Sequence, residues 1–431
     1  MLFAVCLVAA FGFRLAFGLL SDFWADDERN LYLLGLKYYN TGLWPYFGPD
    51  VVYTRSQIPG ALQALLVALP LKLVAIPEAP YVLLNALSFA GLVFFGWYLR
   101  RRTPAVPAWF VWGWLFLCPW TLNYSTHIIN PSYVLAGSLV FFVGVFERLP
   151  GIGLGIVDRR LTLFLIGFGL LWIAQLHMSY PLLAPFVGVV LYFEWRRGWA
   201  SAATSLGWIL AGALVAGSTL LPTLVVYGFR YPADQTALHT QVLFSRLLEL
   251  PVVVARFLSF ASYEVPRFFG NSTASRIAFL TRVWWAAPFA VFAAVVGIVQ
   301  TLGLAYLLVK PRWAGRPWVA VRWLTVLTLA LVSASFVFSV KGPASHTFYL
   351  SLPVATLFAF CCWEPLFARA AWRRLAAALL VAGVVVHAGL MAGRYHTASL
   401  YRDRATVQRA ITEKNYRIIS ERRAEQWGCL Y

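Results

Sequence analysis

Four acidic residues gather within seven positions directly after the first apolar stretch of the chain. The segment Ser21–Arg29 reads SDFWADDER, in a protein of which only 12% of the residues are charged. A carboxylate at the mouth of a membrane cavity is partly buried, which raises its pKa and lets it act as a base. Adjacent carboxylates also suit a divalent cation, and a solvated loop is the plain alternative.

Three side chains outside this cluster could bind a phosphate. Lys341 and His346 flank a short turn that Gly342-Pro343 restricts, so a cation there would lose little entropy on binding. Arg55 lies on the loop that leaves the acidic segment. The alternatives stay open, because a lysine at a span end often snorkels and Arg55 can be a plain surface arginine.

Polar residues at or inside the apolar stretches are further candidates. His177 ends an apolar stretch, where a hydrogen-bonded interface histidine is the alternative to a binding one. Asn130 before Pro131 also fits a helix start, because proline suits the first helical turn. We assign His127 and Asn130 to a cavity, together with Arg14 inside the first span. Such a charge usually faces the bundle and pairs, here with an acid of the cluster or a lipid phosphate.

The composition indicates that lipid surrounds most of the chain. Of its 431 residues, 61% are hydrophobic, whereas a soluble domain has about 45–50% apolar and about 25% charged residues. A soluble enzyme, a disordered chain, a collagen and a secreted disulfide scaffold are thereby excluded. The net charge of +18 comes from basic residues grouped between apolar stretches, which indicates membrane topology and no nucleic-acid partner. The sequence has no Walker-type or GxGxxG loop that would predict a nucleotide site.

A helix needs about 20 mostly apolar residues to cross a hydrocarbon core of ~30 Å. About eleven stretches qualify, which predicts an all-α polytopic membrane protein with about 11–13 transmembrane helices. A further segment, 58–76, is ambiguous because Gly60, Pro70 and Lys72 interrupt it. The predicted spans are 1–20, 81–99, 107–123, 131–146, 161–177, 180–194, 203–222, 284–309, 320–340, 346–367 and 375–393.

The charges of the short loops predict the orientation. If 58–76 does not fully cross, all the basic loops between spans share one side, which the positive-inside rule makes the cytoplasm. We prefer this interpretation. The opposite face then carries the acidic loop 21–57 and the long loop 223–283, where an interfacial amphipathic helix is predicted from the spacing of Leu243, Leu247, Leu250 and Val254. The predicted domains are a transmembrane domain, 1–394, and a short external tail, 395–431.

Several short motifs follow one another on the predicted external face. Asp27-Glu28 comes first, with Leu31-Tyr32 and a turn at 42–45 after it. The later ones are Tyr53–Gly60, Asn130-Pro131-Ser132, Gln175-Leu176-His177, and Ser345–Tyr349 before Leu352-Pro353. These motifs, which cover about residues 20–360, resemble the type-C (GT-C) glycosyltransferases. The resemblance is to the bacterial branch related to protein O-mannosyltransferases and lipid A aminoarabinose transferases. The chain departs from that pattern in its lower span count and in lacking a large soluble C-terminal domain.

The resemblance implies a GT-C-like fold with juxtamembrane helices in the first external loop. It also implies a hexosyl- or pentosyltransferase that moves a sugar from a polyprenyl-phosphate donor to an acceptor hydroxyl. Asp27 matches the family's first-loop acid and is implied as the base, with Asp26 as its competitor. Glu28 would orient the acceptor or hold a divalent cation, if one is used; no other cofactor is implied. The donor phosphate and sugar are assigned to Lys341, His346, Arg55, His177 and Tyr349.

The expected partners are the lipid-linked sugar donor, the bilayer and a glycan, lipid or protein acceptor. The expected location is a bacterial inner (plasma) membrane, with the active site on the periplasmic or extracellular face. Two other classes stay open. A transporter or flippase of lipid-linked sugars usually binds near the bilayer midplane between related halves, whereas these candidates gather at one face. A surface-polysaccharide polymerase or ligase would use the long loop 223–283.

Overall fold

The computed structural model describes residues 2–51, 56–228, 242–310, 316–339 and 342–419. The chain is an all-α polytopic membrane protein. Among the described residues, seven helical segments are long and apolar enough to cross a membrane. They include the helices α1 (Leu2–Ser21), α4 (Ala79–Arg102), α10 (Trp199–Gly217), α14 (Ala287–Val309), α15 (Arg316–Val337), α16 (Leu352–Trp363) and α17 (Ala370–Ala398).

Shorter helices occupy four of the other predicted spans. The stretch 107–123 forms α5 (Ala108–Leu117) and α6 (Pro119–Asn123), because a proline lacks the N–H that a continuous helix needs. The three stretches between 131 and 194 form α7 (Val134–Arg148), α8 (Arg159–Ala174) and α9 (Ala184–Arg196). Glycines at α8 and α10 let these two helices approach closely, since an added Cβ at Gly167 or Gly212 would meet the facing backbone.

The ambiguous segment 58–76 forms a helix too short to cross the bilayer. The helix α3 (Leu62–Leu73) has 12 residues, which at 1.5 Å per residue is about 18 Å of length against a core of ~30 Å. It packs on α2 (Asp26–Thr41), the first juxtamembrane helix, with Gly35 of α2 against Val67. The structure therefore agrees with the partial segment that the loop charges favour.

A small hairpin that the sequence analysis did not predict joins α2 to α3. Its strands β1 (Phe47–Val51) and β2 (Ser56–Pro59) are antiparallel, with Phe47 opposite Pro59. The Thr223 hydroxyl in α11 (Leu221–Tyr227) donates to the Tyr46 carbonyl at 2.6 Å, which ties the hairpin to the helical bundle. The predicted donor-binding residue Arg55 lies outside the described residues.

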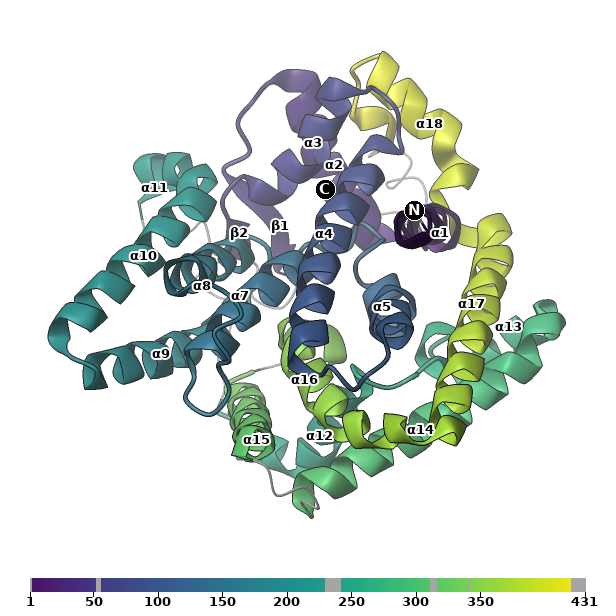
Figure 1. Ribbon diagram of the computed structural model, residues 1–431. Coiled ribbons are helices and arrows are strands. Elements are labelled where there is room, and N and C mark those ends of the chain that lie inside the picture. Colours follow the sequence, from purple (N-terminus) through teal and green to yellow (C-terminus); the bar gives the residue numbers. More distant parts are fainter. Residues whose placement is uncertain (1, 52–55, 229–241, 311–315, 340–341, 420–431) are drawn as a thin grey trace.

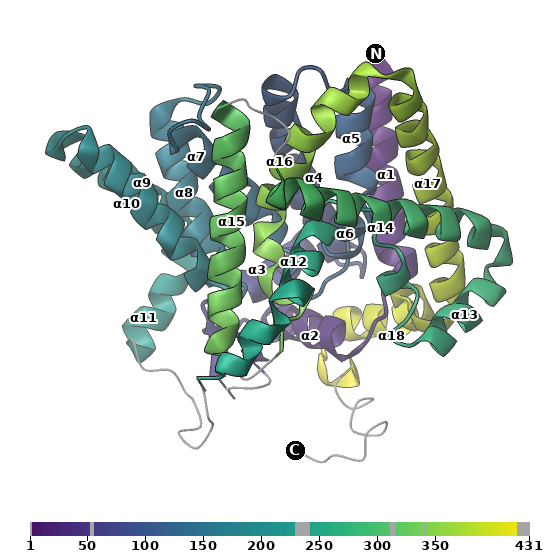
Figure 2. The ribbon, with the colours of Figure 1, turned by 90° about the horizontal axis from the view of Figure 1, so that it is seen from below.

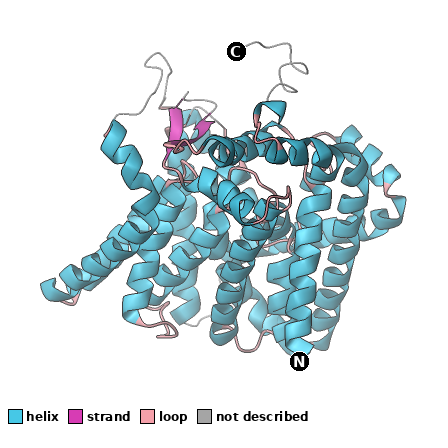
Figure 3. Ribbon diagram, turned by 90° about the horizontal axis from the view of Figure 1, so that it is seen from above, coloured by secondary structure: helices cyan, strands magenta, loops and turns pink. Residues whose placement is uncertain are grey.

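The two ends of the bundle carry different features. Figure 1 shows α1, α5 and α15 nearly end-on, whereas Figure 2 shows them lengthwise, with α2 and α18 (Leu400–Thr412) lying across one end. The N-terminus of α1 lies at the other end, together with the α9–α10 turn. The strands also lie opposite the N-terminus (Figure 3). Helix α14 runs at a steep angle to α1 in both Figure 1 and Figure 2.

Part of the loop 223–283 is helical, as its leucine spacing predicts. The helix α12 (Leu250–Ser259) follows a short 3₁₀ segment, and α13 (Thr273–Arg282) comes later in the loop. Val253 and Phe257 of α12 are buried against the bundle, whereas Leu247 and Leu250 of the predicted stripe are 51% and 44% exposed. The helix therefore packs with one face and presents part of the predicted apolar stripe on the surface.

Candidate functional site

The acidic segment forms a sharp turn between α1 and α2. Helix α1 ends at Ser21, and α2 begins at Asp26 without a side-chain cap. Between them, Trp24 has a φ of 44°, a backbone conformation that non-glycine residues rarely adopt. The Trp24 ring is buried and packs edge-on against Tyr32 of α2, at 5.4 Å between ring centroids. This packing fixes the direction in which α2 leaves α1.

Within this turn the carboxyl groups have different environments. Asp22 and Glu28 are buried, whereas the predicted base Asp27 is exposed. Asp26, the competitor for that role, opens α2. In the sequence these acids form one cluster, and only the fold separates the buried Asp22 and Glu28 from the exposed Asp27.

Asp22 is a paired, buried carboxyl. Its Oδ2 accepts a hydrogen bond from the Tyr81 hydroxyl at 2.6 Å, and its Oδ1 accepts one from the Leu400 backbone N–H at 2.8 Å. Burial raises the pKa of Asp22 well above its usual value, against the opposing effect of these two hydrogen bonds. Asp22 thus connects α1 to α4 and α18.

Glu28 is the buried acid whose titration lies near neutral pH. Burial, together with the negative charge of Asp27, raises its pKa to about 7. Backbone N–H groups at the start of α2 and the guanidinium of Arg394 act in the opposite direction. A carboxyl with a pKa close to the working pH is suited to accept and return a proton.

Arg394 brings a positive charge to this acidic turn. Its Nη1 donates to the Ser21 carbonyl at 3.0 Å and its Nη2 to the Phe268 carbonyl at 2.5 Å. Its guanidinium carbon lies 4.2 Å from the centre of the Phe23 ring. Arg394 is only 5% exposed, and its guanidinium links α17 to the end of α1 and to the loop before α13.

Two further arginines lie beside the late turn that the sequence analysis singled out. Arg267 donates to the Ser345 hydroxyl at 3.3 Å and stands over the Trp120 ring at 5.1 Å from its centre. Arg256 donates to the Pro343 carbonyl. Burial lowers the pKa of Arg256, and the neighbouring charge of Arg267 lowers it further. Two adjacent guanidinium groups repel each other, so an anion bound between them would be stabilised.

An aromatic floor, made of Trp120, Tyr124, Phe268 and Tyr349, lies beside Arg267. The Trp120 ring packs edge-on against Phe268 at 5.4 Å, and Tyr124 lies 5.4 Å from Tyr349. The Tyr349 hydroxyl donates to the Trp120 carbonyl at 3.1 Å. Phe268, whose carbonyl accepts from Arg394, directly follows Arg267. The segment 256–268 and the turn 342–349 therefore meet at these rings, and Arg394 links Phe268 to the first loop.

The predicted late-turn residues have different outcomes in the structure. His346 is half-buried and follows Ser345, which contacts Arg267, whereas Tyr349 is buried beside the Trp120 ring. Lys341 lies outside the described residues. Arg256 and Arg267 were absent from the predicted site, although both stand in the long loop 223–283, away from the short basic loops between the predicted spans. That placement is the signal that could have identified them.

His127 and Arg14 make polar contacts inside the bundle. The His127 Nε2 lies 3.1 Å from the Ser21 hydroxyl, and its ring stacks on Phe17 at 5.5 Å between centroids. Burial lowers the pKa of His127 to about 3, so the ring is neutral and lacks the charge for holding a phosphate. Arg14 donates to the Phe116 carbonyl at 3.0 Å and to the Ser125 hydroxyl at 2.7 Å, which satisfies polar groups near the α5–α6 break.

The remaining candidates lie in turns. The His177 Nδ1 is 2.7 Å from the Ser179 hydroxyl in the turn after α8. Nearby Gln175 donates to the Ala216 carbonyl, toward α10 and not toward the acidic turn. Asn130 is half-buried before Pro131, and its Oδ1 accepts no hydrogen bond within the described part of the chain.

The structure gives no support for a metal site in the part of the chain that it describes. There, no three His, Cys, Asp or Glu side chains gather closely enough to hold a metal ion. The divalent cation that the acidic cluster left open stays a prediction, and no step below depends on it.

The C-terminal helix α18 is attached to the acidic turn. Besides the Asp22–Leu400 hydrogen bond, Asp403 pairs with Arg29 of α2 at 3.6 Å. Arg404 pairs with Glu78, at the start of α4. The buried face of α18 consists of Leu400, Val407, Ala410 and Ile411. Helix α18, which belongs to the segment predicted as an external tail, therefore helps to hold the first loop.

Comparisons with known proteins find similarity at the level of structure. No family model matches the sequence, and no curated protein matches it. Two solved structures do, both of ArnT from Cupriavidus metallidurans, one in the apo state and one bound to undecaprenyl phosphate. They are 15% and 14% identical, and each has a TM-score of 0.44 over 96% of this chain and 78% of the other. At these identities the similarity concerns the fold alone.

Proposed function

We propose that this protein is an integral-membrane glycosyltransferase. It moves a sugar from a polyprenyl-phosphate donor to an acceptor hydroxyl, at the membrane face where α2 and α18 lie. The observation that carries the proposal is the joining of an acidic turn to a group of arginines through Arg394 and Phe268. We assign this face to the periplasmic or extracellular side of a bacterial inner membrane, opposite the basic loops.

The reaction needs a proton acceptor and a site for the leaving phosphate. The acceptor oxygen attacks the anomeric carbon, its proton passes to a carboxylate, and the bond from that carbon to the phosphate oxygen breaks. The lipid phosphate leaves with the electron pair of this bond. Hydrogen bonds from cations to the departing oxygens lower the barrier, because charge develops there in the transition state.

Asp27 is the proposed base, on the strength of the sequence motif and its exposure to an incoming acceptor. Glu28 is the second candidate, favoured by its pKa of about 7. Arg256 and Arg267 are proposed to hold the donor phosphate, with His346 beside them. The apolar floor of Trp120 and Tyr124 is suited to one face of a sugar ring.

The test is to separate transfer from transport. Purified protein in vesicles receives a polyprenyl-phosphate-linked sugar and a mixture of acceptors, and both new glycosidic product and movement of the donor between leaflets are measured. The proposal expects product, and loss of product in Asp27→Asn or Glu28→Gln. Translocation without product would instead identify a flippase and overturn the proposal.

A further inference from the structure

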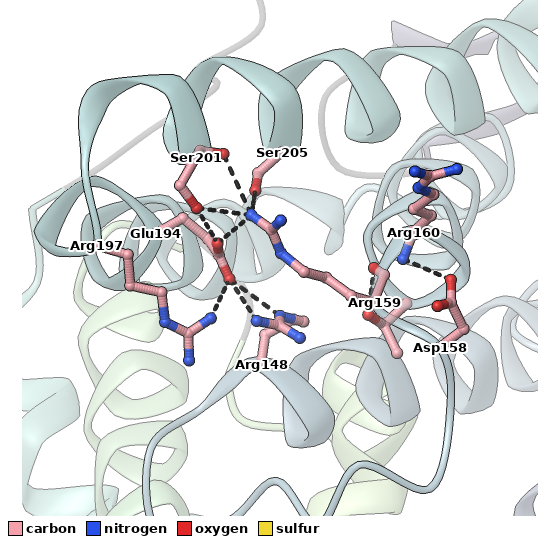
Figure 4. A network of polar contacts seen from close by, with 9 residues as sticks. Arg148, Asp158, Arg159, Arg160, Glu194, Arg197, Ser201 and Ser205 are labelled. Atoms are coloured by element: carbon pink, nitrogen blue, oxygen red, sulfur yellow. Dashed lines mark hydrogen bonds and ion pairs between the residues drawn. The ribbon is translucent and has the colours of Figure 1, made fainter.

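A second cluster of arginines lies at the opposite end of the bundle, around the carboxylate of Glu194. This carboxylate is 1% exposed and accepts hydrogen bonds from three guanidinium groups (Figure 4). Arg148 donates from Nη2 at 2.6 Å, Arg159 from Nη2 at 2.6 Å, and Arg197 from Nη1 at 2.9 Å. The cluster joins the ends of α7, α8 and α9.

The charges of this cluster do not balance. Three guanidinium groups and one carboxylate leave two positive charges in excess. Ser201 and Ser205 of α10 add hydroxyls but no negative charge. One carboxylate needs only one guanidinium for pairing, and each additional cation at this distance repels the others. A second anion would remove that repulsion.

The cluster keeps hydrogen-bond donors for such an anion. Arg159 and Arg197 have side chains that are 40% and 51% exposed, so their outer faces reach the surface. Within the described part of the chain, Nη1 of Arg159 and Nη2 of Arg197 make no hydrogen bond, and the buried Nε of Arg159 also lacks one. A phosphate accepts several N–H groups at once, and guanidinium groups fit it well.

The surroundings of the cluster favour a lipid over a soluble anion. Trp195 and Trp199 flank it and are 55% and 77% exposed. Exposed tryptophans beside arginines are typical of the level of the lipid head groups. Figure 2 shows the α9–α10 turn on the side of the N-terminus of α1, which is the side of the basic loops. Anionic lipids attract basic groups on that side of a membrane.

We infer that the arginine cluster around Glu194 binds the phosphate head group of an anionic phospholipid. Arg159 and Arg197 would contact the phosphate, while Arg148 keeps Glu194 paired. This inference is independent of the proposed transferase activity, because the site stands at the other end of the bundle.

The experiment measures the binding of phosphatidylglycerol and phosphatidylcholine to the purified full-length protein in mixed micelles. The double variant Arg159→Gln/Arg197→Gln keeps Arg148 as the partner of Glu194, so the fold is expected to persist. We expect phosphatidylglycerol to bind at least about tenfold more weakly, as the loss of two charge-assisted contacts implies, with phosphatidylcholine unchanged. The single variant Arg197→Gln, at the more exposed position, should show a smaller loss in the same direction.

Arg374→Gln is the matched control, because Arg374 is an exposed arginine near the start of α17, in another of the basic segments. It should leave phosphatidylglycerol binding unchanged. Equal binding by the wild type and both cluster variants would overturn the inference. So would displacement of phosphatidylglycerol by inorganic phosphate at comparable concentration, since that result would mean a site for soluble phosphate.

Discussion

The buried carboxyl of Glu28 predicts how the stability of the protein changes with pH. Its pKa is about 7 in the folded chain, against 4.5 for an ordinary glutamate. Folding therefore disfavours the charged form, and the wild type is destabilised at a pH above 7. This destabilisation decreases as the pH falls from 7 and disappears below 4.5, where the carboxyl is protonated in both states. The difference of about 2.5 pKa units is worth about 3 kcal/mol at high pH.

The variant Glu28→Gln removes this titration and isolates the effect from other groups. The free energy of unfolding of wild type and variant is measured in detergent micelles by denaturant titration at pH 8 and pH 5. We expect the stability of the variant relative to the wild type to be higher at pH 8 than at pH 5 by roughly 2–3 kcal/mol. Comparing the two proteins at each pH cancels other titrating groups, such as His127, whose lowered pKa gives the opposite trend.

Asp27→Asn is the control for this measurement. It keeps the Glu28 carboxyl and removes a negative charge that raises its pKa, so the pH dependence should remain with its midpoint shifted downward. Parallel stability curves for the wild type and Glu28→Gln between pH 5 and 8 would refute the reasoning. They would mean that water or a partner charge compensates Glu28 in the folded state.

Two further predictions concern packing and charge elsewhere in the bundle. Glu194→Ala leaves three clustered guanidinium groups without their carboxylate and should destabilise the protein by about 3 kcal/mol. This is the lower end of the range for a broken buried ion pair, because Arg159 and Arg197 are half-exposed. A denaturation midpoint equal to that of the wild type would contradict this. Gly212→Ala places a Cβ against the Phe164 carbonyl of α8 and should cost about 1–3 kcal/mol. On the same helix, the Cβ of Gly207→Ala meets no atom within 4 Å, so this substitution should stabilise the protein by about 0.5–1 kcal/mol. Equal effects of the two substitutions would show that α8 and α10 do not pack this closely.

The features that follow from local physics could be predicted from the sequence. The charges of the loops indicated that the interrupted stretch 58–76 is a partial segment, and α3 has only 12 residues. The acidic turn could be located from four acids beside a span end. Its internal division between buried Glu28 and exposed Asp27 depends on how α2 packs, which no local pattern encodes.

The contacts that complete the candidate site join distant parts of the chain. Arg394 and Ser21 are separated by 373 positions, and Leu400 and Asp22 by 378. Nothing in the composition of either segment specifies such a pairing. The tail after Arg394 consequently looked like an appendage, although α18 holds the first loop. Arg148, Arg159 and Arg197 likewise looked like simple topology signals until the fold gathered them on Glu194.

The most informative measurement is single-turnover transfer of sugar from a polyprenyl-phosphate donor by vesicle-embedded wild type and three variants. These are Asp27→Asn, Glu28→Gln and Arg267→Gln, each checked for an unchanged unfolding midpoint at pH 5. If a carboxylate and the arginines act together, Arg267→Gln and at least one acid variant should each slow transfer by about 100-fold, the usual effect of losing a proton acceptor or a charge-stabilising donor. Transfer at the wild-type rate by all three folded variants would contradict the assignment of the reaction to this site.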